Sequence, residues 1–268
     1  MTNETISLLP LERMAQLWRA MAKKRTLVHC MTNDVVQGIT ADLLLAAGAS
    51  PAMVIDEHES ADFAAIADAL LINVGTLTEE RSRSMIQAVQ SAKAHGKPWV
   101  LDPVAAGLLP WRDEKITTFL SMQPTVIRAN ASEIMSLAGV GAGGHGVDST
   151  DDSANALQAA KTLAQRYRCI VAVTGKTDYA TDGQKVVAAT GDVPMATLAV
   201  GTGCSLSALV AAFCATGEDV LEATVAALMI MKLAEQKAVD HSTGPGSFRV
   251  ALLDALYNNL HQTIRKAS

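Results

Sequence analysis

The sequence predicts an α/β fold of three layers, in which helices cover both faces of a mainly parallel central sheet. Short apolar runs alternate with longer amphipathic segments along most of the 268 residues, which is the pattern of consecutive strand–helix–strand units. The composition is 49% hydrophobic but only 4% aromatic, as expected for aliphatic strands that are buried on both faces. No long polar linker divides the chain, so we expect a single domain over residues 1–268.

The alternation starts with a helix over residues 11–24, where apolar side chains recur at helical spacing. Apolar runs of four to seven residues then predict strands, and the periodic segments between them predict helices that stop at glycine. In chain order these segments are TLVHCMTN (strand), VVQGITADLLLAAG (helix), PAMVI (strand), ESADFAAIADA (helix), LLINVG (strand), TEERSRSMIQAVQSAKAHG (helix) and PWVLDPV (strand).

The second half continues the pattern with helices over 111–122 and 153–167, the helix SEIMSLAG, and the strands TVIRAN and CIVAVTG. An Asp182-Gly183 pair separates two β-prone runs in DYATDGQKVVAAT, which predicts a hairpin and an antiparallel edge of the sheet. After Gly203 the sequence predicts only helices, the first of which begins near Ser205.

Charge and cysteine usage exclude several classes of protein. The formal net charge is -5 and the longest basic run is KKR, so we expect no nucleic-acid partner. No run of about 18 uncharged apolar residues and no signal peptide occur, so we expect neither membrane insertion nor export. The four cysteines lack the paired spacing of a zinc site, which favours reduced thiols in the cytoplasm.

Two glycine-rich motifs and one histidine are interpreted structurally. GVGAGG, residues 139–144, follows a helix instead of a strand, so we interpret it as a helix stop and a flexible loop. GKT, residues 175–177, lacks the earlier glycine of a phosphate-binding P-loop, because Ile170 occupies that position. His29 lies in an apolar strand and is expected to be a core residue.

Ligands of open α/β sheets bind beyond the carboxyl ends of the strands, and polar residues follow several strands here. Asp102 comes after PWVL and Glu133 lies in NASE, and two such carboxylates suit a magnesium ion carried by a nucleotide. Arg128 and Thr174 end two apolar strands and suit phosphate oxygens. The alternatives are a turn former for Asp102, a capping box for Glu133, and an ion pair or strand-end cap for Arg128 and Thr174.

The segment GTGCSLSALVAAF places a glycine-rich turn, Gly201–Cys204, directly before an apolar helix. The unpaired N–H groups and the dipole at the start of such a helix favour an anion. The alternative is a tight turn into a buried helix, with Cys204 as a small apolar side chain.

Together these segments resemble one family, the hydroxyethylthiazole kinases. The resemblance covers nearly the whole chain and is carried by CMTNDVVQGITADLLLAAGASPAM, LLINVGTL, LDPVAAG, IRANASEIMSLAG, VAVTG, GTGCSLSALVAAF and GPGSF. It implies a ribokinase-like fold and transfer of the γ-phosphoryl group of ATP to the alcohol of 4-methyl-5-(2-hydroxyethyl)thiazole, with Mg²⁺, in thiamine biosynthesis and salvage. It also implies a homotrimer with active sites at subunit boundaries.

The resemblance assigns roles to individual residues. It implies that Met53 and Gly201 contact the thiazole and that Asn33 lines the same pocket. ATP is then bound by Arg128 and Thr174, while Asp102 and Glu133 organise magnesium and its waters. One position departs from the family pattern, because Ala129 stands where the usual IRGNASE has glycine.

The residue after the glycine turn is usually an aspartate in the wider ribokinase-like group, where it is the expected base, but here it is Cys204. Phosphoryl transfer depends mainly on positioning and charge stabilisation. We therefore expect the amides of Gly201, Thr202 and Gly203 to stabilise the transferring group, with Cys204 shaping the pocket and acting at best as a poor base.

Two other functions are compatible with these residues. One is a kinase of another small alcohol, such as hydroxymethylpyrimidine or a sugar, which a substrate panel distinguishes. The other is a non-catalytic sensor of nucleotide or thiazole, although binding alone does not require Asp102, Glu133, Arg128 and the glycine turn together.

Overall fold

The computed structural model describes residues 6–140 and 149–265, and it confirms the α/β class. One nine-stranded sheet has the strand order β1-β9-β8-β7-β6-β5-β4-β2-β3. Neighbouring strands are parallel throughout except on the two sides of β8. The strands are β1 (Ile6–Leu8), β2 (Leu27–Met31), β3 (Ser50–Ala52), β4 (Ala69–Asn73), β5 (Trp99–Asp102), β6 (Val126–Asn130), β7 (Ile170–Thr174), β8 (Thr177–Thr181) and β9 (Val186–Thr190).

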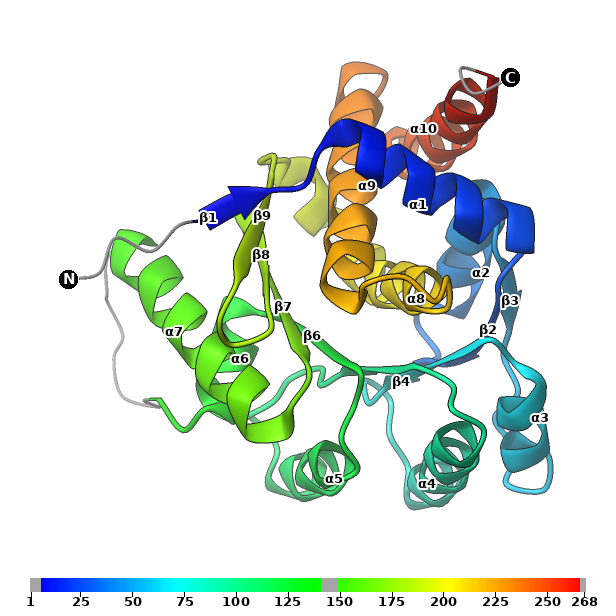
Figure 1. Ribbon diagram of the computed structural model, residues 1–268, viewed down its shortest axis with the longest axis vertical. Coiled ribbons are helices and arrows are strands. Elements are labelled where there is room, and N and C mark those ends of the chain that lie inside the picture. Colours follow the sequence, from blue (N-terminus) through cyan, green and yellow to red (C-terminus); the bar gives the residue numbers. More distant parts are fainter. Residues whose placement is uncertain (1–5, 141–148, 266–268) are drawn as a thin grey trace.

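Helices cover both faces of this sheet (Figure 1). One layer holds α1 (Leu11–Lys24), α2 (Gln37–Ala47), α8 (Thr202–Cys214), α9 (Val220–Asp240) and α10 (Pro245–Arg265). The other layer holds α3 (Ser60–Ile66), α4 (Glu79–Ala94), α5 (Pro110–Ser121), α6 (Ala131–Leu137) and α7 (Ser149–Tyr167). A 3-10 helix, η1 (Pro194–Leu198), precedes α8.

Each face of the sheet has its own apolar core, which follows from strands that are buried on both sides. Alternate residues of β4 divide between the two cores, with Leu71 in one and Ile72 in the other. Helix α8 is buried along its length from Ser205 to Cys214. A helix enclosed on all sides is mostly apolar all round, which explains why LSALVAAFC is apolar except for Ser207, whose hydroxyl has a hydrogen-bond partner.

The antiparallel strand is not at the edge of the sheet, so that prediction is wrong. The hairpin itself is confirmed, because Asp182 Oδ1 accepts hydrogen bonds from the backbone N–H groups of Gln184 and Lys185 at 2.8 and 2.7 Å. Strand β1 adds to β9 in parallel and forms the edge. Its three residues are all exposed, so no buried apolar pattern marks it in the sequence.

Three predicted boundaries also differ. The strand expected over PAMVI is β3, which ends at Ala52, and α8 begins at Thr202 instead of near Ser205. Helix α7 begins at Ser149 instead of Ser153. Of the motif GVGAGG, Gly139 (φ 73°) follows α6 as expected for a helix stop, whereas residues 141–144 lie outside the described residues.

The chain reverses direction across the sheet between β2 and β4. From β2 it passes outward to β3, returns to β4 on the other side of β2, and then proceeds through β5, β6 and β7. Such a switch point opens a crevice at the carboxyl ends of the strands. The crevice between β2 and β4 is therefore the place that the topology provides for a ligand.

The structure also places His29 and the four cysteines and gives the character of the helices. His29 is a buried core residue whose Nε2 lies 2.6 Å from the carbonyl oxygen of Val54. Cys30, Cys169, Cys204 and Cys214 are free thiols in the described part of the chain. Within residues 6–140 and 149–265, none of the helices combines the length and the apolar character needed to cross a bilayer.

Candidate active site

The glycine turn before α8 lies at the carboxyl edge of the sheet and has a conformation that requires glycine. Gly201 has φ +96°, and a Cβ there would lie 2.6 Å from Cγ2 of Ile39 in α2. Thr202 Oγ1 donates to the carbonyl oxygens of Ala196 and Ala199, at 2.9 and 3.1 Å, which ties the turn to η1. Among the residues that the structure describes, no side chain caps the start of α8, so its first N–H groups remain available to an anion.

Arg128 lies against this turn from β6. Its Nη2 donates to Thr174 Oγ1 at 2.5 Å, and a Cβ on Gly203 would lie 3.1 Å from its Nη1. The side chain is only 9% exposed, and its Nε has no hydrogen-bond partner in the described chain. A buried guanidinium with an unused donor beside a helix N-terminus is suited to oxygen atoms of phosphate.

A chain of buried polar side chains crosses the crevice between β2, β4 and β5. Asn33 Nδ2 lies 3.5 Å from Cys204 Sγ and donates to Asn73 Oδ1 at 3.0 Å. Asn73 Nδ2 donates to Asp102 Oδ2 at 2.7 Å, and Ser207 Oγ donates to the same oxygen at 2.9 Å. The chain therefore fixes the Asn33 amide next to the cysteine, with the Asp102 carboxylate at its other end.

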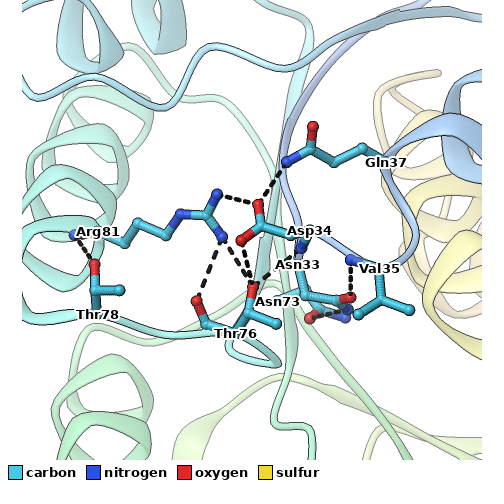
Figure 2. A network of polar contacts seen from close by, with 8 residues as sticks. All are labelled: Asn33, Asp34, Val35, Gln37, Asn73, Thr76, Thr78 and Arg81. Atoms are coloured by element: carbon cyan, nitrogen blue, oxygen red, sulfur yellow. Dashed lines mark hydrogen bonds and ion pairs between the residues drawn. The ribbon is translucent and has the colours of Figure 1, made fainter.

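The segments that follow β2 and β4 are joined by a second polar network (Figure 2). Asp34, after β2, forms an ion pair with Arg81 of α4 and accepts from Gln37 Nε2 at 3.0 Å. Arg81 also donates to Thr76 Oγ1 at 3.0 Å. Because Asp34 directly follows Asn33, this network holds the two sides of the switch-point crevice in register.

The electrostatics of this crevice keep Cys204 protonated. Burial and the nearby Asp102 carboxylate raise the pKa of the Cys204 thiol to about 11. Burial also raises the pKa of Asp102 to about 6; the positive charge of Arg128 opposes this rise and Glu133 adds to it. Near neutral pH the site thus presents a neutral thiol and a mostly ionised carboxylate.

Glu133 has the capping role that the sequence left open. Its Oε2 accepts from the backbone N–H of Asn130 at 3.0 Å, and Asn130 Oδ1 accepts from the N–H of Glu133 at 2.9 Å, which together form a capping box. Its Oε1 accepts from the N–H of Ala105 at 2.9 Å. Ala105 has φ +62°, a conformation uncommon for alanine, so Glu133 also stabilises the loop after β5.

The acidic side chains near the turn could hold a magnesium ion only through water. In the described part of the chain, no three potential His, Cys, Asp or Glu ligands come together. Asp102 and Glu133 nevertheless lie near enough for Glu133 to raise the pKa of Asp102. Asp102 Oδ2 already accepts two hydrogen bonds, but Asp102 Oδ1 and both Glu133 oxygens keep a lone pair, so the pair fits a hydrated ion that is held through its waters.

Most of the predicted site residues share one edge of the sheet. Asn33, Asp102, Arg128, Thr174 and the turn Gly201–Cys204 lie at the carboxyl ends of its strands. Met53 directly follows β3, the edge strand beside β2, and packs half-buried against the core. Ala129 lies buried within β6 without positive φ, so this position does not require glycine.

A cavity of about 450 Å³ opens beside Arg128 and Thr174. Its wall includes the turn residues Thr202 and Gly203 and three residues of α9, which are Met231, Lys232 and Glu235. Another hollow of about 610 Å³ lies between the loop after β5 and α6, with Glu133 in its wall. The arrangement offers an anion site at the turn with space on the Arg128 side for a larger molecule.

Sequence reasoning missed several polar residues of the site. Asn73 ends the strand LLIN, and a polar residue at a strand end is a usable signal because such residues meet at one edge of the sheet. Ser207, Lys232 and Glu235 lie inside helices, where only the packing of α8 and α9 brings them to the site. Asp178 belongs to β8, the first strand of the hairpin, and forms an ion pair with Lys232 at 3.1 Å.

Glu235 should make the stability of the protein depend on pH. Burial raises the pKa of its carboxyl from 4.5 to about 7; Lys232 opposes this rise, as does Arg128, and Asp178 adds to it. The folded state therefore favours the protonated carboxyl, and this preference contributes to the free energy of unfolding. The contribution is fully present below pH 4.5 and is lost as the pH rises through 7. Glu235→Gln stays neutral and should be more stable than wild type at pH 8.5, by up to about 3 kcal/mol, but equally stable at pH 4.5.

Urea denaturation at the two pH values, without ligands, measures this difference. Glu222→Gln is the matched control, since Glu222 lies on the same helix but pairs with Arg13 at the surface; it should lose less than about 1 kcal/mol. An equal effect of Glu235→Gln at pH 4.5 and 8.5 would contradict the prediction.

Comparisons with known proteins agree with this geometry. Residues 18–262 match the model of the hydroxyethylthiazole kinase family. A hydroxyethylthiazole kinase of Klebsiella pneumoniae (strain 342) is 55% identical over 257 residues, which cover 96% of this chain and 98% of the relative. The structure of a hydroxyethylthiazole kinase protein from Pyrococcus horikoshii OT3 superposes with a TM-score of 0.86 at 36% identity, over 94% of this chain and 96% of that one. A ribokinase-like superfamily protein of Enterococcus faecalis V583 superposes with a TM-score of 0.68 at 14% identity, over 96% of this chain and 92% of the other, which shows the ribokinase-like fold.

Proposed function

The chain belongs to the hydroxyethylthiazole kinase family and phosphorylates the hydroxyl of hydroxyethylthiazole with ATP, and we propose that the turn Gly201–Cys204 is where the phosphoryl group is transferred. The observation that carries this proposal is the uncapped start of α8 with the Arg128 guanidinium beside Gly203. Both groups present N–H donors to an anion, and such preorganised donors stabilise the charge of a phosphoryl group in transfer.

In this proposal ATP and the thiazole bind on opposite sides of the turn. Arg128 and Thr174 bind the phosphates of ATP, in the cavity that they line. The thiazole occupies the switch-point crevice, with Asn33, Gly201 and Met53 as its contacts. Its alcohol then lies next to Cys204, and the amides of Gly201, Thr202 and Gly203 receive the γ-phosphoryl group between the two substrates.

Cys204 shapes this pocket and does not act as a base. Its thiol has a pKa near 11 and faces the Asn33 amide, so it holds its proton at neutral pH. In a loose transition state the alcohol is deprotonated late, and positioning by the neighbouring amides is what the chain contributes.

Replacements of Cys204 test this role. Cys204→Ala should keep kcat within about 10-fold of wild type, since no proton transfer is lost, and Cys204→Ser should do the same. Cys204→Asp introduces a carboxylate base and should keep or raise kcat. The measurement is steady-state turnover, and a loss of more than about 100-fold in both neutral variants, with an inactive aspartate variant, would show that the thiolate is essential.

Magnesium and cellular location complete the proposal. Asp102 and Glu133 would hold a hydrated Mg²⁺, which supplies neutralisation of the phosphate charge when it is bound. Four free thiols agree with a reducing compartment, so we place the protein in the cytoplasm.

The function is tested by incubating the purified protein with hydroxyethylthiazole, ATP and magnesium and detecting the thiazole monophosphate by mass spectrometry. Gly203→Val is the site control, because a side chain there meets the Arg128 guanidinium. Product that disappears in the control supports both the activity and its place. Nucleotide binding without product from any small alcohol would overturn the proposal.

We also propose a homotrimer with its sites at subunit boundaries, as the family resemblance implies. Met53 follows the edge strand β3, which is separated from β5 by the two strands β4 and β2, so in the proposal it contributes to a site at the boundary with a neighbouring copy. Exposed apolar side chains flank this edge, namely Val35, Leu45 and Ile55. Such residues on a soluble protein often mark an interface.

Mixed oligomers test the shared site. Met53→Arg and Arg128→Ala should each be inactive, but refolding the two variants together should restore a part of wild-type activity, because some boundaries then combine an intact Met53 with an intact Arg128. Light scattering of the wild type should give the mass of three chains. A monomer, or mixtures that stay inactive although they are trimeric, would contradict the proposal.

A further inference from the structure

We infer that Glu235 is a nucleotide-binding residue, whose carboxylate accepts a hydrogen bond from the nucleoside part of ATP. The donor is either a ribose hydroxyl or the exocyclic amine of the base. The inference rests on the proposed function, since it concerns how the same site recognises its phosphoryl donor.

Glu235 is a buried carboxylate without a partner. Its side chain lies on α9 and is only 7% exposed, yet it has no hydrogen bond or ion pair within residues 6–140 and 149–265. The carboxylate lines the cavity beside Arg128 and is accessible from it. A ligand that enters the cavity can therefore supply the donor that the protein does not.

The cavity beside Glu235 is the one in which the nucleotide is proposed to bind. Arg128, Thr174 and Gly203 line it together with Glu235. The remaining wall includes apolar side chains, which suit the faces of a purine base. They are Val193, Pro194, Ala196, Leu206 and Met231.

The charges around Glu235 show which kind of group it accepts. Lys232 is already engaged, because its Nζ donates to the carbonyl oxygen of Gly175 at 2.9 Å and pairs with Asp178 at 3.1 Å. Arg128 donates to Thr174. Asp178 is paired with Lys232, so Glu235 is the acceptor left on this wall, and an acceptor does not suit the oxygen atoms of a phosphate. A neutral donor remains, and on a nucleotide it belongs to the ribose or the base.

The experiment compares wild type, Glu235→Gln and Glu235→Ala with four nucleotides: ATP, 2′-deoxy-ATP, 3′-deoxy-ATP and inosine triphosphate. KM and kcat are measured with hydroxyethylthiazole, and Kd by calorimetry. Glu235→Gln keeps the shape and removes the charge, so it serves if the alanine variant does not fold. Glu222→Gln, the same change on the outer face of α9, is the matched control and should have wild-type constants.

We expect Glu235→Gln to raise the KM and Kd for ATP by about 10- to 100-fold with kcat within about 3-fold, since a hydrogen bond to a charged group is lost. In wild type, one analogue should show the same loss and thereby identify the donor: a deoxynucleotide for the ribose, or inosine triphosphate for the amine. Glu235→Gln should no longer distinguish that analogue from ATP.

Wild-type constants for all four nucleotides in both Glu235 variants would overturn the inference. Failure of the proposed function would be recognised separately, because wild type would then form no thiazole monophosphate. The calorimetric Kd values would still decide the role of Glu235 in that case.

Discussion

Arg128→Ala should lower kcat/KM for ATP by at least about 10²–10³-fold, which is the usual cost of losing one preorganised donor to the charge of a transition state. Arg128 is buried between Thr174 and Gly203 and has an unused Nε. The other two cations in the cavity wall are Lys176 and Lys232; Lys232 is paired with Asp178 and Lys176 is exposed, so neither is expected to replace Arg128. Steady-state kinetics with varied ATP measures the loss.

Two variants make this prediction specific. Arg128→Lys keeps the charge but loses the planar fork, so it should retain only part of the activity. Lys176→Ala removes a cation from the same cavity whose side chain is 83% exposed, and it should change kcat/KM by less than about 3-fold because exposed charges are screened. Equal losses in Arg128→Ala and Lys176→Ala would indicate general attraction of ATP, not a defined contact.

Gly201→Ala should abolish most activity and also destabilise the fold. The new Cβ would lie 2.6 Å from Ile39 Cγ2 and 3.2 Å from Val36 Cγ1, at a φ of +96°. Relief of this contact moves the turn away from α2, and a displacement of about 1 Å in a catalytic group costs about 100-fold in rate. We expect a loss of kcat of that size and of about 2–3 kcal/mol in unfolding free energy.

Gly217→Ala is the matched control for this change. Gly217 also has positive φ, +79°, but a Cβ there meets no atom within 4 Å. It should lose only about 1 kcal/mol of stability and keep wild-type kcat. If Gly201→Ala kept its kcat and lost stability only as much as Gly217→Ala, the turn would not need its native position for transfer.

Local patterns were sufficient for most of the fold. Strands such as LLIN and CIVAV and the helix stop at Gly48 depend on residues close in sequence, and the structure confirms them. Strand β1 was missed because pairing with β9, and not burial, makes it a strand. The position of β8 inside the sheet was missed for the same reason, since the addition of β1 is a long-range event.

The candidate site divides in the same way. Asp102, Arg128 and Thr174 follow from a general rule, because polar residues at the ends of parallel strands meet at one edge. Glu235 and Ser207 follow from no such rule. They lie inside helices, and their place depends on how α8 and α9 pack on the sheet.

Periodicity and short motifs are properties of neighbouring residues, so the sequence was sufficient to predict the alternation of strands and helices from residue 11 onward, the glycine turn before α8 and the family. Which polar groups are buried together depends on the packing of distant segments. This packing placed Asn73 between Asn33 and Asp102, kept the Cys204 thiol protonated, and left Glu235 without a partner in the cavity wall. The physical reason is that burial and hydrogen-bond partners are set by contacts between segments far apart in the chain, and these contacts fix the charge and the orientation of each group.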